Sequence, residues 1–466
     1  MGMTYSQLNA GVSLNVVGLA LGCVFFIPLT KKYGRRSTYV FSTGIMAATS
    51  WWSSRMNTVA EMYLTNLLFG LAGSTNETIA EMTIADLFFV HQRGLANGFY
   101  ITAATVGNFL APTLAGVQAA SMGWRWSYYT VGIILSILFV LFLFFFEETK
   151  YIPVSVGHAD GHQETDGSTS KPLKSGAGDK TPEMKPSAYS KETEVETGVD
   201  SSPPLNPYRQ RMRFLTPTDE SSWTGYMTPI KTALLPHVLF TAIECANCVV
   251  FLVLFTSFNS IVFSAPPYSF STAGVGLMLV GPFIGNLLGS LYGGLLGDWI
   301  VVRLARRNRG IFEPEMRLYI LFLPALLLGG GIIIFGATAD RGMHWIYPSI
   351  GGACFAFDSG SMMDVSFTVV IDTYKDITAE SFVFITFIRN AATIGVPFAV
   401  VPWMNLTSLT SIGAISGCIA SVVCFWYIPL LIWGRQIREA LHARYHRLAM
   451  EAGQTGQAGV LAAVRA

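Results

Sequence analysis

Long apolar stretches, separated by short polar segments, run along most of this chain. A helix needs about 20 mostly apolar residues to span the hydrocarbon core of a bilayer. Eleven stretches meet this length, at residues 10–30, 37–56, 60–87, 94–117, 127–146, 232–262, 272–300, 317–338, 344–371, 377–401 and 410–434. The pattern therefore predicts an all-α polytopic membrane protein with about eleven transmembrane helices.

The composition agrees with a membrane protein and excludes several other classes. Of the 466 residues, 51% are hydrophobic and 13% are charged, against about 25% charged in a typical soluble domain. A net charge of +1 gives no reason to expect nucleic-acid binding. The six cysteines are scattered through apolar runs, which favours small buried side chains over disulfides or a metal site.

No sequence pattern typical of ATP-driven transport, metalloprotease, serine hydrolase or kinase chemistry occurs in the chain. We therefore expect a protein that is not an enzyme and that holds no metal or other cofactor.

The basic residues predict the orientation of the helices, because cytoplasmic loops of membrane proteins are enriched in Lys and Arg. If the loop at 31–36 is cytoplasmic, alternation places five further segments on the same side, namely 88–93, 147–231, 301–317, 372–376 and the residues after 434. These six segments hold 26 of the 30 Lys and Arg residues. We therefore expect residue 1 to lie outside and the arginine-rich loops to lie inside.

A long polar segment separates five of the apolar runs from the other six. Residues 151–228 are rich in Ser, Thr, Gly, Pro, Lys and Glu, a composition that cannot bury a core. We expect a disordered cytoplasmic linker there, between an N-terminal bundle at 1–150 and a C-terminal bundle at 229–435. The cytoplasmic tail, 436–466, is predicted to be either a basic amphipathic helix on the membrane surface or a solvated helix.

Two loops, one in each half, share parts of one sequence pattern. They lie at 28–41 (PLTKKYGRRSTYVF) and 293–310 (GGLLGDWIVVRLARRNRG). Both resemble the loop of pattern G-x-L-x-D-x-x-G-R-[KR] that the major facilitator superfamily carries between helices 2 and 3 and again between helices 8 and 9. The first copy matches the end of the pattern and the second matches its beginning, at Gly34, Arg35, Arg36, Gly294, Leu296 and Asp298, followed by an arginine-rich turn from Arg303.

The resemblance implies a facilitator fold of two pseudo-symmetric helix bundles. In that family the loop aspartate holds the loop and the helix ends together in one conformation, and Asp298 would do this in the second half. Lys31 occupies the aspartate position in the first half, so we expect no acid-based latch there, while Gly34 permits the turn.

Aligning Asp298 with Lys31 gives an offset of 267 residues. We therefore expect that the first of the family's twelve helices is missing, from the protein or from its gene model.

Further stretches resemble a narrower group within this superfamily. Gly107, Pro112 and Gly116 match the helix-5 antiporter motif, and residues 122–129 resemble the loop before helix 6 in fungal twelve-spanner drug:H⁺ antiporters. Residues 76–98 and 303–318 are similar to the fungal polyamine and organic-cation transporters. One departure concerns helix 4. The arginine of drug antiporters is Asn66 here, four residues before Gly70, so we expect no proton relay through that position.

Ionisable residues inside the predicted spans are the candidate binding and proton-coupling residues, because burying a charge in the membrane is costly. Glu77 and Glu81 lie four apart, on one face of a helix. Five deep carboxylates against one arginine favour a cationic substrate, or protons, over an anion. The candidates are Glu77, Glu81, Glu244, Asn247, Asp358, Asp364, Arg389 and Asn390.

Several of these residues have structural alternatives. Arg389 either pairs with one of the acids or contacts substrate directly. Asp358 and Asp364 lie about 120° apart around a helix, so both cannot point at one ligand, and either one alternatively caps a helix break near Gly360. Asp86, near Arg93 at a cytoplasmic helix end, is interpreted as a gate salt bridge.

The leading hypothesis is a proton-coupled secondary transporter for small organic cations such as polyamines, drugs or a fungal metabolite. It would work by alternating access of two bundles, with protonation of Glu77, Glu81 or Glu244 exclusive with substrate binding. The direction is open, since the helix-5 motif favours export and the polyamine-like branch favours uptake. The alternatives are a non-transporting membrane receptor or sensor, and a non-functional truncated transporter. We expect a monomer, spanning the plasma membrane several times.

Overall fold

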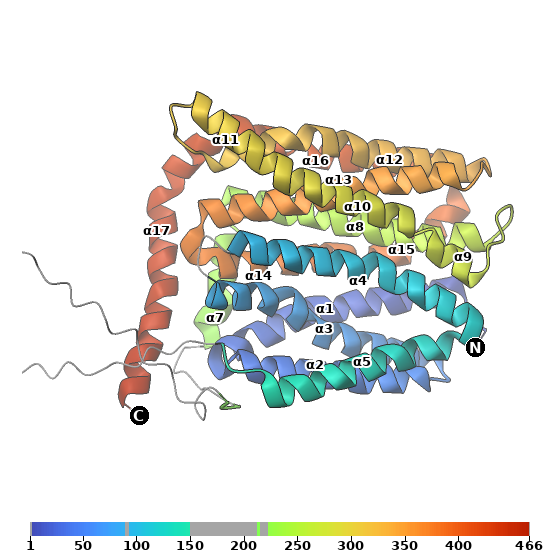
Figure 1. Ribbon diagram of the computed structural model, residues 1–466, viewed down its shortest axis with the longest axis horizontal. Helices are drawn as coiled ribbons and strands as arrows, with labels where there is room; N and C mark the ends of the chain where they lie inside the picture. The colour runs from blue at the N-terminus through green and yellow to red at the C-terminus, as the bar shows by residue number, and fades with distance from the viewer. Residues whose placement is uncertain (1, 89–92, 150–211, 215–221, 466) are drawn as a thin grey trace, which may run out of the picture.

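The computed structural model describes residues 2–88, 93–149, 212–214 and 222–465. Within these ranges the regular secondary structure is entirely helical. The helices run roughly parallel in two bundles, so that the turns gather at the two ends (Figure 1). The loops rich in Lys and Arg lie at the end of the molecule that also carries the C-terminal helix, which we call the arginine-rich end.

The N-terminal bundle consists of five long helices. They are α1 (Tyr5–Tyr33), α2 (Arg35–Ser54), α3 (Val59–Leu87), α4 (Arg93–Met122) and α5 (Trp124–Phe145). α1 packs along α3, and α2 packs against both α3 and α5.

The C-terminal bundle has more segments because several of its spanning helices are interrupted. Its elements are α8 (Pro236–Ser264), α9 (Thr272–Leu277), α10 (Val280–Leu291), the π-helix η1 (Tyr292–Leu296), α11 (Gly297–Arg307), the 3₁₀ helix η2 (Pro314–Leu321), α12 (Phe322–Asp340), α13 (Ile346–Thr373), the 3₁₀ helix η3 (Lys375–Ile377), α14 (Thr378–Thr393), α15 (Val396–Leu406), α16 (Leu409–Cys424) and α17 (Tyr427–Arg465). The predicted runs 272–300 and 377–401 are therefore each built from more than one helical segment.

Eight helical segments of the described chain are long and apolar enough to cross a membrane by length and composition alone. Each of the eleven predicted runs nevertheless corresponds to a helix or a stack of helices in the structure. The runs outside the eight are α2, α3 and α4, which have 20, 29 and 30 residues but carry more polar side chains. In α2 many of these Ser and Thr side chains are buried against neighbouring helices.

Glycines set the closest helix crossing in each bundle. A Cβ atom added at Gly18 or Gly22 of α1 would collide with backbone carbonyl groups of α3. A Cβ at Gly285 or Gly289 of α10 would collide in the same way with α13. Small residues at four-residue spacing let helices approach this closely. Both pairs are separated by 267 residues, the same offset that aligns Lys31 with Asp298, so the two bundles repeat one packing arrangement.

Two seams join the bundles. α1 packs against α14 and α15, and α4 packs against α9 and α10. In the second seam the hydroxyl of Thr105 donates to Oδ1 of Asn286 at 2.8 Å, and the hydroxyl of Thr113 donates to the carbonyl of Gly276 at 2.9 Å. Gly116 also lies against α9, where a Cβ would come within 2.8 Å of the Thr272 carbonyl. The antiporter-like motif therefore lies where the two halves touch.

The first-half loop does have an acidic partner, contrary to the expectation drawn from Lys31. Glu148, just beyond α5, accepts hydrogen bonds from the backbone N–H groups of Arg35 at 2.8 Å and Arg36 at 3.2 Å. A carboxylate at a helix N-terminus satisfies unpaired N–H groups and complements the helix dipole. Gly34 has φ +107°, a conformation that favours glycine, so its predicted role in the turn is confirmed.

The end of the predicted linker is ordered. Residues 222–228 belong to the helix α7 (Ser222–Thr232), which packs against both α1 and α14 at the arginine-rich end. Extending the disordered linker to residue 228 was therefore wrong. Most of the remaining linker lies outside the described residues.

The tail is neither a separate surface helix nor a freely solvated one. α17 begins at Tyr427, separated by two residues from the end of α16 at Cys424, and extends across the arginine-rich end of the molecule (Figure 1). Leu448 is buried against the C-terminal bundle, and Arg438 lies 3.5 Å from the carboxylate of the buried Glu315. Lys231 of α7 pairs with Glu451 of α17 at 2.6 Å. These contacts dock the tail onto the protein.

Substituting Gly289 with Ala should destabilise the protein, because the added methyl group meets the Phe357 carbonyl on α13. Overpacking of this kind costs about 1–3 kcal/mol. The control is Gly330→Ala on α12, where a Cβ meets no atom within 4 Å. Thermal unfolding of the purified protein should show a lower midpoint for Gly289→Ala only. Equal midpoints would show that the glycine crossing does not limit stability.

Candidate functional site

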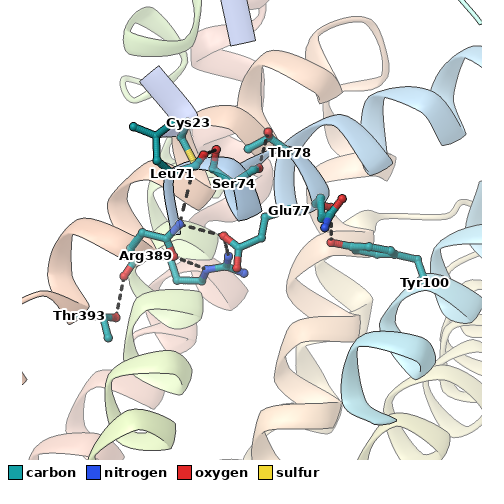
Figure 2. A network of polar contacts seen from close by, with 10 residues as sticks. Cys23, Leu71, Ser74, Glu77, Thr78, Tyr100, Arg389 and Thr393 are labelled. Carbon is teal, nitrogen blue, oxygen red and sulfur yellow. Dashed lines mark hydrogen bonds and ion pairs between the residues drawn. The ribbon is translucent and has the colours of Figure 1, made fainter. Parts of the chain in front are cut away.

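A polar cluster connects the two bundles between α3 and α14. Nη2 of Arg389 lies 2.6 Å from Oε2 of Glu77, and Nδ2 of Asn390 donates to the same oxygen at 2.9 Å. Nε of Arg389 also donates to Oδ1 of Asn390 at 3.4 Å. Cys23 of α1 completes the cluster, with its sulfur 3.9 Å from Nδ2 of Asn390. We call these four residues the cross-bundle cluster (Figure 2).

The cross-bundle cluster is mostly buried, but its charged side chains keep some exposed surface. The Glu77 side chain is 31% exposed and the Arg389 side chain 12% exposed. Both bonds to Glu77 use Oε2, and no hydrogen bond or ion pair within the described part of the chain uses Oε1. The carboxylate therefore has one oxygen bound across the bundles and one oxygen open to a further donor.

Local backbone structure fixes both sides of this contact. α3 is continuous through Glu77, and the hydroxyl of Tyr100 on α4 donates to the carbonyl of Asn76 at 3.1 Å, which joins α3 to α4 at this level (Figure 2). On the other side, α14 ends at Thr393, and its hydroxyl donates to the Arg389 carbonyl at 2.8 Å. The next helix, α15, begins at Val396 with Pro397 in its first turn, so the helix is interrupted one turn beyond the arginine.

A second group of acids lies inside the C-terminal bundle. Glu244 of α8 and Asp358 of α13 are both fully buried. The thiol of Cys248 lies 3.8 Å from Oδ2 of Asp358, and Nδ2 of Asn247 donates to the Ala420 carbonyl at 3.3 Å. No Lys, Arg or His of the described chain forms an ion pair with either carboxyl group. We call Glu244 and Asp358 the buried acid pair.

The other candidate acids are not part of these clusters. Asp364 lies on α13 beside Gly293 and Gly294 of η1. α13 is one continuous helix, so the alternative in which Asp358 or Asp364 caps a break near Gly360 is wrong. The side chains of Glu81, Asp86 and Arg93 lie outside the described part of the structure, so the predictions for them remain untested.

Asp298 lies in a charged network at the arginine-rich end. Arg317 of η2 bridges two carboxylates, with Nη1 2.7 Å from Asp298 and Nε 3.1 Å from Asp372 at the end of α13. Through Arg317, Asp298 in the first turn of α11 is linked to η2 and to the end of α13. Arg303, the first residue of the arginine-rich turn, lies over the Trp299 ring, with its Cζ 5.3 Å from the ring centroid.

Sequence reasoning missed several partners that the fold brings together. Cys23 looked like a small core residue, and only its contact with Asn390 links it to the site. Arg317 and Asp372 are charged residues at helix ends, and this position could have identified them as candidate partners. Glu148 follows an apolar run directly, which is a similar signal.

Breaking the cross-bundle pair should loosen the seam around Cys23, which is 1% exposed. Arg389→Ala leaves the Glu77 carboxylate without its cation, so water should enter and maleimide labelling of Cys23 should accelerate severalfold. Arg341→Ala, at an exposed arginine outside the bundles' contact, is the control. Peptide mass spectrometry can follow labelling of this cysteine alone. An unchanged Cys23 labelling rate in a folded Arg389→Ala protein would contradict the role of the pair.

Comparison with known proteins places the chain among membrane transporters. The family model of the Major Facilitator Superfamily matches residues 1–397. The chain is 27% identical to an uncharacterized MFS-type transporter of Schizosaccharomyces pombe, C1271.10c, over 96% of this chain and 82% of the relative. It is 25% identical to YHK8 of Saccharomyces cerevisiae, a probable drug/proton antiporter, over 83% of this chain and 68% of the relative.

The fold is similar to a solved transporter. The xylose transporter XylE of E. coli, in a partially occluded inward-open conformation, superposes with a TM-score of 0.54 at 13% identity, over 91% of this chain and 89% of that one. At this identity the likeness concerns the fold alone. The helical architecture, the repeated glycine crossings and the family match agree, and the chain is a multi-pass membrane transporter of the Major Facilitator Superfamily, not an enzyme.

Proposed function

We propose that this transporter moves small organic cations, coupled to protons, by alternating access of its two bundles. The observation that carries the proposal is the cross-bundle cluster, in which Glu77 of the first bundle holds Arg389 of the second. A site shared by both halves is the place where a ligand can bias their relative positions.

A cation is the ligand that the cluster suits. Glu77 is a carboxylate that already binds a guanidinium group and an amide donor, and its Oε1 atom is open to another donor. An ammonium group of a substrate can approach this oxygen with charge-assisted hydrogen bonds. An anionic substrate would meet Arg389 only after displacing Glu77.

Arg389 acts in this proposal as an internal competitor. It neutralises Glu77 when no substrate is present, which a charge at this depth requires. A substrate cation that binds Oε1 draws on the same negative charge and weakens the ion pair, while Arg389 keeps its contact with Oδ1 of Asn390. The link between α3 and α14 is thereby exchanged for a link through the substrate, which frees the two bundles to rearrange.

The buried acid pair is proposed as the proton-carrying site. Holding Glu244 and Asp358 both charged, without a cation, carries a large desolvation and repulsion cost. A proton on one of them removes most of that cost. α8, which carries Glu244, packs along α14, which carries Arg389, so a change at either site can reach the other through one helix contact.

Two further considerations support this assignment over the alternatives. YHK8, a relative, is described as a probable drug/proton antiporter, which agrees with coupling to protons. Within the described residues, no feature favours a receptor or a non-functional fragment. The direction of transport and the membrane in which the protein resides stay open predictions, with the plasma membrane as the expected location.

Replacing Glu77 with Gln should remove the cation site while keeping the side-chain shape. Transport of labelled spermidine, or of a cationic dye panel, in proteoliposomes with a proton gradient should fall by about tenfold or more, because a charge-assisted contact is lost. Asp340→Asn, at an exposed acid bound to Thr410, is the control. Wild-type flux in the Glu77→Gln protein would remove the residue from the site.

Replacing Glu244 with Gln or Asp358 with Asn should uncouple transport from the gradient. We expect counterflow of the same cation to persist, because no proton transfer is needed for exchange, while gradient-driven accumulation disappears. Parallel measurement of both activities separates loss of coupling from loss of folding. Gradient-driven accumulation at the wild-type level in both variants would contradict the assignment of the buried acid pair.

A further inference from the structure

A polar cavity opens at the arginine-rich end, between α11, η2 and α17. Its volume is about 370 Å³, and its lining includes Arg307, Asn308, Glu313, Met316, Tyr319 and Arg435. Ligand pockets commonly begin near this size. We call it the arginine pocket. It is separate from the cross-bundle cluster, and a ligand could bind in it whether or not the protein transports cations.

Two arginines, Arg307 and Arg435, and two glutamates, Glu313 and Glu315, line the arginine pocket. Arg307 is exposed and forms no ion pair within the described part of the chain. Arg435 is shared between Glu313 at 3.2 Å and Glu439 at 3.0 Å. Glu315 is buried and lies beside His237 and Arg438, so Arg307 is the lining arginine that is left for a bound anion.

Three more arginines belong to the same segment as Arg307, and none of them lines the pocket. They lie in and just after α11, are exposed, and are Arg303, Arg306 and Arg309. Together with Arg307 they make the segment 303–309 strongly positive, which favours a multiply charged anion near it.

An apolar strip leads away from the pocket toward the middle of the membrane. Tyr319 lines the pocket and is 57% exposed. Phe322, Leu323 and Leu326 follow it by three, four and seven positions, which places them on the same helical face. All three are exposed large hydrophobic side chains of α12. A molecule seated in the pocket therefore has an apolar surface directly beside it.

We propose that the arginine pocket binds the phosphorylated headgroup of an anionic phospholipid, while its acyl chains lie along this strip of α12. The phosphate accepts hydrogen bonds from Arg307 and from Arg435, and Arg435 leaves Glu313 to do so. Basic pockets at the cytoplasmic ends of transmembrane helices suit inner-leaflet lipids of this charge. The expected cytoplasmic position of the arginine-rich loops agrees with this leaflet.

The test uses the full chain in nanodiscs of phosphatidylcholine containing a minor fraction of phosphatidylinositol phosphate, with bound lipid counted by native mass spectrometry. Arg307→Gln should weaken retention of the phosphoinositide about fivefold, the factor that ~1 kcal/mol per arginine gives. Arg444→Gln is the matched control, because Arg444 is exposed on the same end of the molecule but does not line the pocket. It should bind as the wild type does.

Glu313→Gln gives the sharpest prediction, because it should act in the opposite direction. It removes the carboxylate that competes with the phosphate for Arg435, so retention should increase by a similar factor. A misfolded variant cannot gain binding. Weaker or unchanged retention in Glu313→Gln would overturn the proposed geometry.

Two other outcomes would also overturn the proposal. Equal losses in Arg307→Gln and Arg444→Gln would mean that the lipid is attracted by the general positive charge of this end and not by a site. Soluble inositol bisphosphate displacing the lipid completely at equal concentration would mean that the pocket binds phosphate groups without using the acyl chains along α12.

Discussion

The ion pair between Glu77 and Arg389 is the contact on which the proposed coupling of the two bundles depends. Both residues lie deep in helices of a membrane protein, where leaving either one charged without a partner is costly. The two side chains form an ion pair across the bundles, with Nη2 of Arg389 2.6 Å from Oε2 of Glu77. Each bundle therefore supplies the partner for the charge of the other. A ligand that changes this contact must also change how the halves fit together.

The pair differs in kind from the seam contacts around it. Thr105 with Asn286, and Thr113 with the Gly276 carbonyl, are neutral hydrogen bonds between tightly packed helices. They hold α4 against α9 and α10 by shape and close approach. Glu77 and Arg389 are held by charge, and charge is what a cationic substrate or a proton can exchange. The buried acid pair lies apart from this contact, connected to it through the packing of α8 on α14.

Much of the fold was predictable from the sequence because hydrophobic length and basic-residue asymmetry are local signals. The eleven runs each correspond to helices, and the 267-residue offset from a partial motif reappears as matched glycine crossings at Gly18 and Gly285. Interruptions within helices were not predicted, because segments such as 272–300 remain apolar through the break.

The site was less predictable because its partners are distant in the chain. Helical spacing identified Glu77 and Arg389 as deep charges, but it could not show that they meet, or that Cys23 lies beside them. The substitution of Lys31 for the family's aspartate suggested a lost latch. Glu148, more than a hundred residues away, supplies a carboxylate to that loop instead. Sequence patterns locate such residues on elements, while tertiary packing decides which of them touch.

The central claim is that a substrate cation and Arg389 compete for one carboxylate. Equilibrium binding of labelled spermidine or another organic cation to the purified wild type, Glu77→Gln and Arg389→Gln tests this claim most directly. Competition predicts that Glu77→Gln abolishes binding and that Arg389→Gln strengthens it, because the internal competitor is removed. Weaker binding in both variants, in proteins with unchanged thermal midpoints, would contradict competition and make Arg389 part of the binding surface.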